Sequence, residues 1–156
     1  GLAMGFFDGY NVSTSGMSAQ RTRINVVSAN IANAKTTHTQ EGGPYKKQQV
    51  VFEDILLASG KKTNSNDVET TNNVNSDISL RGVGVKSIVQ SDAKPVMRFE
   101  PAHPDANEQG YVAYPDINPV IEMVDLIEAI RSYEANLASF NTHKYIDSKT
   151  LDILNM

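Results

Sequence analysis

The chain has 156 residues, of which 40% are hydrophobic and 21% charged, and it contains no cysteine. This length suits one domain with its own core. The formal net charge of -4 provides no basic surface for nucleic acid, so we expect no nucleic-acid partner. The lack of cysteine excludes disulfides and thiolate metal sites.

Neither end of the chain carries a membrane or secretion signal of the usual kind. No window approaches the ~20 consecutive apolar residues that a membrane-spanning helix needs, and no basic segment followed by an apolar run opens the chain. Residues 1–3 precede Met4, which we interpret as the natural start, so we treat them as a cloning remnant. If the protein is exported, we expect export without a conventional signal peptide.

Apolar residues recur at helical spacing from about Tyr10 to Ala34, which predicts a helix in an N-terminal assembly segment, residues 4–36. Asn11 or Ser13 is expected to cap its start, because both side chains can accept from free backbone N–H groups. Threonines followed by Gly42-Gly43-Pro44 are expected to end it.

A second long helix is predicted in a C-terminal assembly segment, residues 118–156. Asn118 is expected to be its cap and Pro119 its first residue, where a missing N–H costs nothing. A helix from Pro119 to Leu154 is about 50 Å long at ~1.5 Å per residue, longer than a small domain needs. Alternating spacings of three and four residues define its apolar stripe: Met123, Leu126, Ile130, Tyr133, Leu137 and Phe140.

The middle region, residues 37–117, changes to a strand-like pattern. Short β-rich runs are predicted at 45–52, 83–90, 96–99 and 110–114, with a turn at 92–95 and a mobile loop near 59–77. The expected fold class is therefore α+β, in which the long terminal helices pair as an antiparallel coiled-coil-like bundle beside a small β-rich middle region.

Few residues suggest chemistry. His103 and Asp105, together with a carboxylate from elsewhere in the chain, leave open the site of a small metal-dependent hydrolase. A rigid turn in a proline-rich segment explains the two residues better. Gly82 and Gly84 do not have the spacing of a phosphate-binding loop and are expected to permit a strand bend or bulge. We predict no catalytic residue, no metal, no cofactor and no small-molecule substrate.

Three carboxylates, Glu122, Asp125 and Glu128, lie three residues apart near the start of the C-terminal helix. This spacing is compatible with metal chelation, but no facing histidine or second carboxylate set accompanies it. We interpret the three residues as an exposed acidic ridge that the helix dipole favours.

Both ends of the chain resemble one protein family. Ser15-Gly16-Met17-Ser18-Ala19-Gln20-Arg21 and the run from Ser28 to Ala34 resemble the N-terminal signature of flagellar rod and hook proteins, and residues 118–126 and 131–136 resemble the matching C-terminal end. Residues 41–52 and 103–115 are similar to the small proximal-rod members of that family.

The resemblance implies a structural subunit of the bacterial flagellar basal-body rod, the helical drive shaft that transmits motor torque to the hook, and not an enzyme. The implied partners are further copies of the chain, other proximal and distal rod subunits, the rod-base adaptor FliE and the flagellar type III export apparatus. The implied location is the periplasmic rod, reached without a cleaved signal peptide. A coiled-coil adaptor acting outside the flagellum is the remaining alternative.

The expected assembly interface combines apolar stripe residues with asparagines that are unusual inside helices. Asn30 and Asn33 are expected to hydrogen-bond to a neighbouring helix and to fix its register. The predicted interface residues are Met17, Ile24, Val27, Asn30, Ile31, Asn33, Met123, Leu126, Ile130, Tyr133, Asn136, Leu137 and Phe140.

Overall fold

The computed structural model describes residues 2–59 and 79–155. Its elements in chain order are α1 (Leu2–Ala32), β1 (Gln48–Ser59), β2 (Ser79–Gln90), β3 (Val96–Phe99), β4 (Tyr111–Tyr114) and α2 (Pro119–Leu154). Helices at the ends and strands between them confirm the α+β class. The mobile loop expected near 59–77 lies outside the described residues, apart from Ser59 at the end of β1.

Helix α1 begins earlier than expected. It already runs from Leu2, so the prediction that Asn11 or Ser13 caps its start is wrong. Ser13 is instead buried inside the helix contact, where its hydroxyl donates to Ser139 Oγ of α2 at 3.1 Å. The helix ends at Ala32. The chain then reverses through Gly42 and Gly43, whose φ angles of 87° and 76° are in the left-handed region that favours glycine.

Helix α2 begins as predicted. The side chain of Asn118 accepts a hydrogen bond from the backbone N–H of Val120 at 3.0 Å, and Pro119 is the first helical residue. The helix then continues for 36 residues. None of the described helices is long and apolar enough to cross a membrane.

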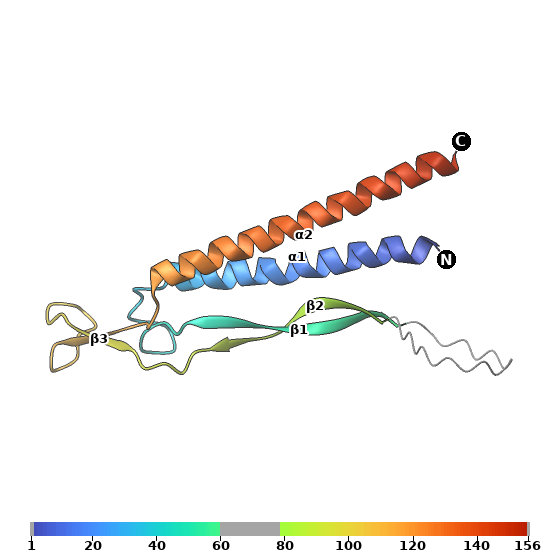
Figure 1. Ribbon diagram of the computed structural model, residues 1–156. Coiled ribbons are helices and arrows are strands. Elements are labelled where there is room, and N and C mark those ends of the chain that lie inside the picture. Colours follow the sequence, from blue (N-terminus) through green and yellow to red (C-terminus); the bar gives the residue numbers. More distant parts are fainter. Residues whose placement is uncertain (1, 60–78, 156) are drawn as a thin grey trace, which may run out of the picture.

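The two helices contact each other along much of their length, and α1 lies between α2 and the β1–β2 ribbon (Figure 1). Contacting residues include Gly16 with Asn136 and Asn30 with Glu122, so partner numbers on α2 rise as residue numbers fall along α1. A Cβ atom on Gly16 would lie 2.5 Å from Asn136 Oδ1. The missing side chain therefore allows the helices to approach closely.

The strands form two separate antiparallel ribbons. β1 pairs with β2 from Gln48↔Gln90 to Ser59↔Ser79, with two register irregularities, and β3 pairs with β4 from Val96↔Tyr114 to Phe99↔Tyr111. The first two strands are thus longer than predicted, and β1 includes the apolar residues around Leu56. Residues 92–95 connect two ribbons, because the strands that flank them pair with different partners.

The interior is small. Among the described residues, its buried apolar side chains are Ala19, Val26 and Val27 of α1, Ala129 of α2, and Val112 of the separate β3–β4 ribbon. Gly82 on β2 is also buried, and a Cβ there would lie 2.6 Å from Ser15 Oγ and 2.7 Å from Leu57 Cδ1. Gly82 was expected to permit a strand bend or bulge, and one register irregularity lies beside it, where Leu56 and Ala58 pair with Arg81 and Leu80. Its missing side chain also lets β2 approach α1 closely.

Candidate assembly surface

The first three turns of α2 bury one charged residue and expose several apolar ones. Glu122 is 2% exposed and Ala129 is fully buried, whereas Val120 is 70%, Val124 61% and Ile127 49% exposed. A surface helix of a self-contained domain exposes mainly polar residues. Exposed apolar side chains of this kind are typical of a surface that binds a partner.

The buried carboxylate of Glu122 is compensated by a cation and an amide. Lys47 Nζ lies 2.8 Å from its Oε1, and Asn30 Nδ2 donates to its Oε2 at 3.4 Å. A buried charge is tolerated when it is paired and hydrogen-bonded in this way. We call the four residues Asn30, Tyr45, Lys47 and Glu122 the polar junction.

Asn30 is the centre of the polar junction and is 1% exposed. Its Nδ2 donates to the carbonyl of Gln48 at 2.8 Å, and its Oδ1 accepts from the Gln48 N–H and the Tyr45 hydroxyl, both at 3.0 Å. One asparagine thus joins α1 to the start of β1 and to α2. Its amide reaches another helix, as predicted, but that helix belongs to the same chain.

Tyr45 contributes the phenol of the junction. Burial, and then the charge of the Glu122 carboxylate, raise the pKa of Tyr45 above its ordinary value, because both disfavour the phenolate. The neutral hydroxyl is therefore the form that donates to Asn30.

The interpretation of Glu122, Asp125 and Glu128 as an exposed acidic ridge is wrong for Glu122. That residue faces the interior, because Lys47 supplies a cation there. Asp125 and Glu128 both pair with Arg23 of α1, and the Arg23–Glu128 distance is 3.5 Å. Asp125 and Glu128 thus bind α2 to α1. Glu122 binds α2 to Lys47, which immediately precedes β1.

The outer face of α2 has a regular pattern. Exposed residues recur there at spacings of three and four, as along a coiled-coil seam. We define the outer seam as Val120, Met123, Ile127, Ile130, Glu134 and Leu137. Its apolar members are 38% to 70% exposed, and Glu134 is its one charged residue.

The predicted interface residues divide into three groups by burial. Val27 and Asn30 are buried within the chain. Met123, Ile130 and Leu137 are exposed and belong to the outer seam. The remaining residues are half-buried: Met17, Ile24, Ile31, Asn33, Leu126, Tyr133, Asn136 and Phe140.

The prediction for Asn33 differs from the structure. Its amide donates to the Ala29 carbonyl at 2.9 Å and accepts from the Thr36 hydroxyl at 3.1 Å, so it closes the end of α1 and does not cross to another helix.

The sequence-based prediction of interface residues missed Val120, Val124 and Ile127, which are exposed on α2. The available signal was that apolar residues lie on more than one side of the first turns of this helix, because a helix with one covered face has polar residues on its other sides.

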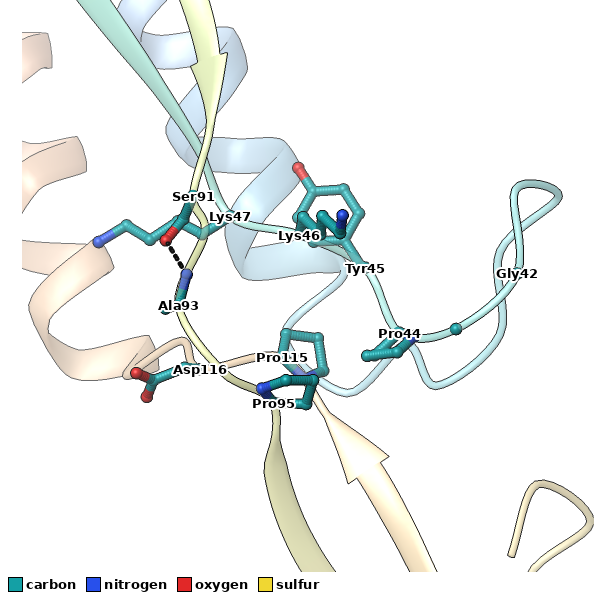
Figure 2. A pocket seen from close by; sticks show the side chains of 11 residues that line it. Gly42, Pro44, Tyr45, Lys46, Lys47, Ser91, Ala93, Pro95, Pro115 and Asp116 are labelled. Atoms are coloured by element: carbon teal, nitrogen blue, oxygen red, sulfur yellow. Dashed lines mark hydrogen bonds between the residues drawn. The ribbon is translucent and has the colours of Figure 1, made fainter. Parts of the chain in front are cut away.

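A cavity of about 180 Å³ lies where the connections of the middle region meet (Figure 2). Pro44, Pro95 and Pro115 form one side of it, Tyr45 lies above them, and Lys47 extends away from it. Among its lining residues, the Ser91 hydroxyl oxygen accepts a hydrogen bond from the Ala93 N–H at 3.1 Å. We interpret the cavity as the space between three connecting segments whose backbones are stiffened by proline.

His103 and Asp105 form a local turn near the β3–β4 ribbon. His103 Nδ1 accepts from the Asp105 N–H at 3.0 Å, and the Asp105 carboxylate accepts from the Thr37 hydroxyl at 2.6 Å. In the described ranges 2–59 and 79–155, no three potential ligands converge as a metal site requires. The contacts of the pair are those of the rigid turn.

Comparison with known proteins identifies the family. Residues 11–37 match the family described as flagella basal body rod protein, and residues 108–153 match the C-terminal family of the flagellar basal body rod FlgEFG proteins. The flagellar basal-body rod protein FlgC of Borreliella burgdorferi is 38% identical over 97% of this chain and 99% of its own length. The chain belongs to the FlgC family.

Other FlgC proteins agree over nearly the whole chain. Those of Bacillus subtilis and Salmonella typhimurium are 37% and 35% identical, over 94% and 92% of this chain and 97% and 94% of their own lengths. This FlgC-family chain is therefore a structural subunit of the flagellar basal-body rod and not an enzyme. It is located in the flagellar basal body and assembles there with other rod components.

Proposed function

We propose that this FlgC-family subunit occupies the proximal rod and assembles through its terminal helices into the helical drive shaft. The drive shaft transmits motor torque to the hook. The observation that supports this proposal is the outer seam of α2, whose apolar side chains are exposed while Glu122 is buried. Side chains such as Ile127 contribute about 1.5–3 kcal/mol each when they become fully buried. A few per contact stabilise an assembly.

In this proposal α1 and α2 act as one antiparallel coiled-coil-like unit. Two contacts support this arrangement. Ser13, in the first half of α1, contacts Ser139 in the second half of α2, and Asn30, near the end of α1, contacts Glu122 near the start of α2. The polar junction then sets the register between the helices, since sliding one turn would leave Glu122 buried without Lys47. The assembly interface is wider than the outer seam and includes half-buried residues such as Met17 and Ile24.

The individual partner proteins follow from the proposed position in the rod. The proximal location implies contact with the rod-base adaptor FliE, with other proximal and distal rod subunits, and with further copies of the chain. Delivery through the flagellar type III export apparatus, without a cleaved signal peptide, is part of the same proposal. The β-rich middle region acts as a spacer and outer contact layer.

Replacing Ile127 with aspartate tests the proposal. Ile127 is 49% exposed, so Ile127→Asp leaves the chain folded but places a charge in the seam. We expect loss of rods and of motility in cells that carry the variant as their only copy, because burying an unpaired carboxylate opposes assembly. The readout is the number of rod-containing basal bodies seen by electron microscopy.

A matched control is Ala135→Asp, which adds the same charge to an exposed position of α2 outside the seam. Circular dichroism of both purified variants checks that the helices persist. Normal rods in the Ile127→Asp cells would contradict the proposal, and so would an equal loss in both variants.

A further inference from the structure

The contact of α2 with α1 is centred on polar and small residues. In the described part of α2, the buried residues are Glu122 and Ala129. Other members of the contact follow at the spacings of three, four and seven residues that are typical of a coiled-coil seam. We call the set the inner stripe: Glu122, Asp125, Ala129, Asn136, Ser139 and His143. It contains no apolar side chain larger than that of alanine.

Glycines of α1 lie opposite the ring and the amide of the inner stripe. A Cβ atom on Gly9 would overlap the His143 ring, and one on Gly16 would overlap the Asn136 amide. The two glycines are seven residues apart, and so are their two partners. Side-chain size is therefore matched across the contact at both levels.

The same series of α1 continues with charged and amide contacts. Arg23 pairs with Asp125, and Asn30 donates to Glu122 at 3.4 Å within the polar junction. Lys47, the cation of that junction, lies 2.8 Å from Glu122. We call the Glu122 and Asp125 carboxylates the anchors of the inner stripe, because separating a buried or partly buried charge from its partner is costly.

The apolar stripe of α2 lies one residue further along the helix than the inner stripe. Five of its members directly follow an inner-stripe residue: Met123, Leu126, Ile130, Leu137 and Phe140. Successive residues of an α-helix are rotated by about 100°, so turning α2 by one residue exchanges the two stripes. Met123, Ile130 and Leu137, which are 38% to 47% exposed, would then face α1.

Burial of apolar area by itself favours the turned arrangement, because the inner stripe has almost no apolar area to bury. The anchors oppose the turn, since it carries Glu122 away from Lys47 and Asp125 away from Arg23. We infer that the inner stripe fixes the rotation of α2 about its own axis, against a second packing in which the apolar stripe covers the α1 of the same chain. The observed packing keeps the outer seam uncovered, and the second one closes it.

Two pairs of cysteines report the rotation, because the chain has no cysteine of its own. Ser13→Cys with Ser139→Cys reports the observed packing, in which the two hydroxyl oxygens are 3.1 Å apart. Ser13→Cys with Phe140→Cys reports the packing turned by one residue. Under mild oxidation of the otherwise natural chain, we expect the first pair to close within single chains at least about tenfold faster than the second.

Removal of both anchors is expected to reverse this preference. Glu122→Ala with Asp125→Ala leaves the helix intact, because alanine is the best helix former. In this anchor-free chain the second cysteine pair is expected to close at least about tenfold faster than the first. Sedimentation velocity gives a second readout, because a chain that covers its own apolar stripe self-associates less, whereas a chain that is merely destabilised exposes more apolar surface and self-associates more.

Glu134→Ala with Asp152→Ala is the matched control. It removes two carboxylates from exposed positions of the same helix and changes the net charge by the same amount. The conservative variant Glu122→Gln with Asp125→Asn keeps side chains of the same shape that still hydrogen-bond. Both variants are expected to keep the preference of Ser13→Cys for Ser139→Cys.

An anchor-free chain that still prefers the Ser139→Cys pair would overturn the inference. Absence of both cross-links would do so as well, with helix content followed by circular dichroism, because the apolar stripe would then not replace the inner stripe. An equal reversal in the matched control would trace the effect to net charge and would also overturn it. The inference concerns packing within one chain, whereas Ile127→Asp tests the proposed function, so either can fail without the other.

Discussion

At the scale of single residues, one asparagine and one glutamate join three segments of the chain. Asn30 uses both ends of its amide, and Glu122 uses both carboxylate oxygens, so the buried polar atoms are satisfied. Removing one member leaves the others buried without a partner, which costs more than the hydrogen bond itself contributes. The polar junction therefore demands one arrangement of α1, β1 and α2.

Tyr45 makes the stability of this junction depend on alkaline pH. Its pKa is raised in the folded chain, by burial first and by Glu122 second, so folding favours the neutral phenol. The stabilisation is complete below the ordinary tyrosine pKa near 10 and is lost as the pH rises through the folded value. We expect the free energy of unfolding to fall above about pH 10, and to fall less steeply in Tyr45→Phe.

Urea unfolding at a series of alkaline pH values measures this difference. Tyr114, whose pKa is raised mainly by its hydrogen bond to Glu100, contributes separately, and Tyr114→Phe measures that part. The charged residues of the junction, Lys47 and Glu122, are not substituted in either variant. Parallel pH profiles for the wild type and Tyr45→Phe would show that the phenol does not act in this way.

At the scale of the elements, glycines set how closely α1 approaches its two neighbours. Gly16 faces Asn136 of α2, and Gly82 of β2 faces Ser15 of α1. The Gly16 contact is with the end of a side chain that can rotate. At Gly82 a new methyl group meets a short serine and a packed leucine, which have less freedom to move.

Gly82→Ala is therefore expected to destabilise the chain by about 1–3 kcal/mol, the usual cost of overfilling a packed contact. In an open strand the same change is favourable, because glycine is a poor strand former. Thermal unfolding measures the difference. Ser87→Ala, at an exposed position of the same strand, is the control and should change stability by less than about 0.5 kcal/mol. A stable Gly82→Ala variant would show that β2 can move away from α1.

At the scale of the whole molecule, the chain buries few apolar residues and exposes many. Val112 and Ala129 are fully buried, but Leu154, Val120 and Ile153 are 74%, 70% and 69% exposed. Such large exposed patches are uncommon on proteins that act alone. The fold is thus a scaffold for an assembly in which neighbours complete the packing.

The isolated chain should therefore self-associate, and its thermal stability should rise with concentration, because association stabilises the folded form by mass action. Sedimentation velocity and thermal unfolding at two concentrations measure both effects. Ile127→Asp is expected to reduce the association without loss of helix content. A wild-type chain that stays monomeric, with a constant unfolding temperature, would contradict this view of the molecule.

Local chemistry alone determined several features. The start of α2 at Asn118-Pro119 was predictable because a cap and an N-terminal proline act within a few residues. The positions of the strands were only partly predictable, since β1 continues to Ser59, beyond the predicted run at 45–52. Its extension depends on pairing with β2, which is distant in sequence.

The family, the α+β class and the three-and-four spacing of apolar residues along both terminal helices follow from the order of the residues alone. Which face of α2 lies inside depends on how the folded chain packs. On a helix with apolar residues on more than one side, periodicity fits several orientations equally well. The choice depends on Lys47 and Arg23, whose cations hold Glu122 and Asp125 inward and so leave Val120, Val124 and Ile127 on the outside.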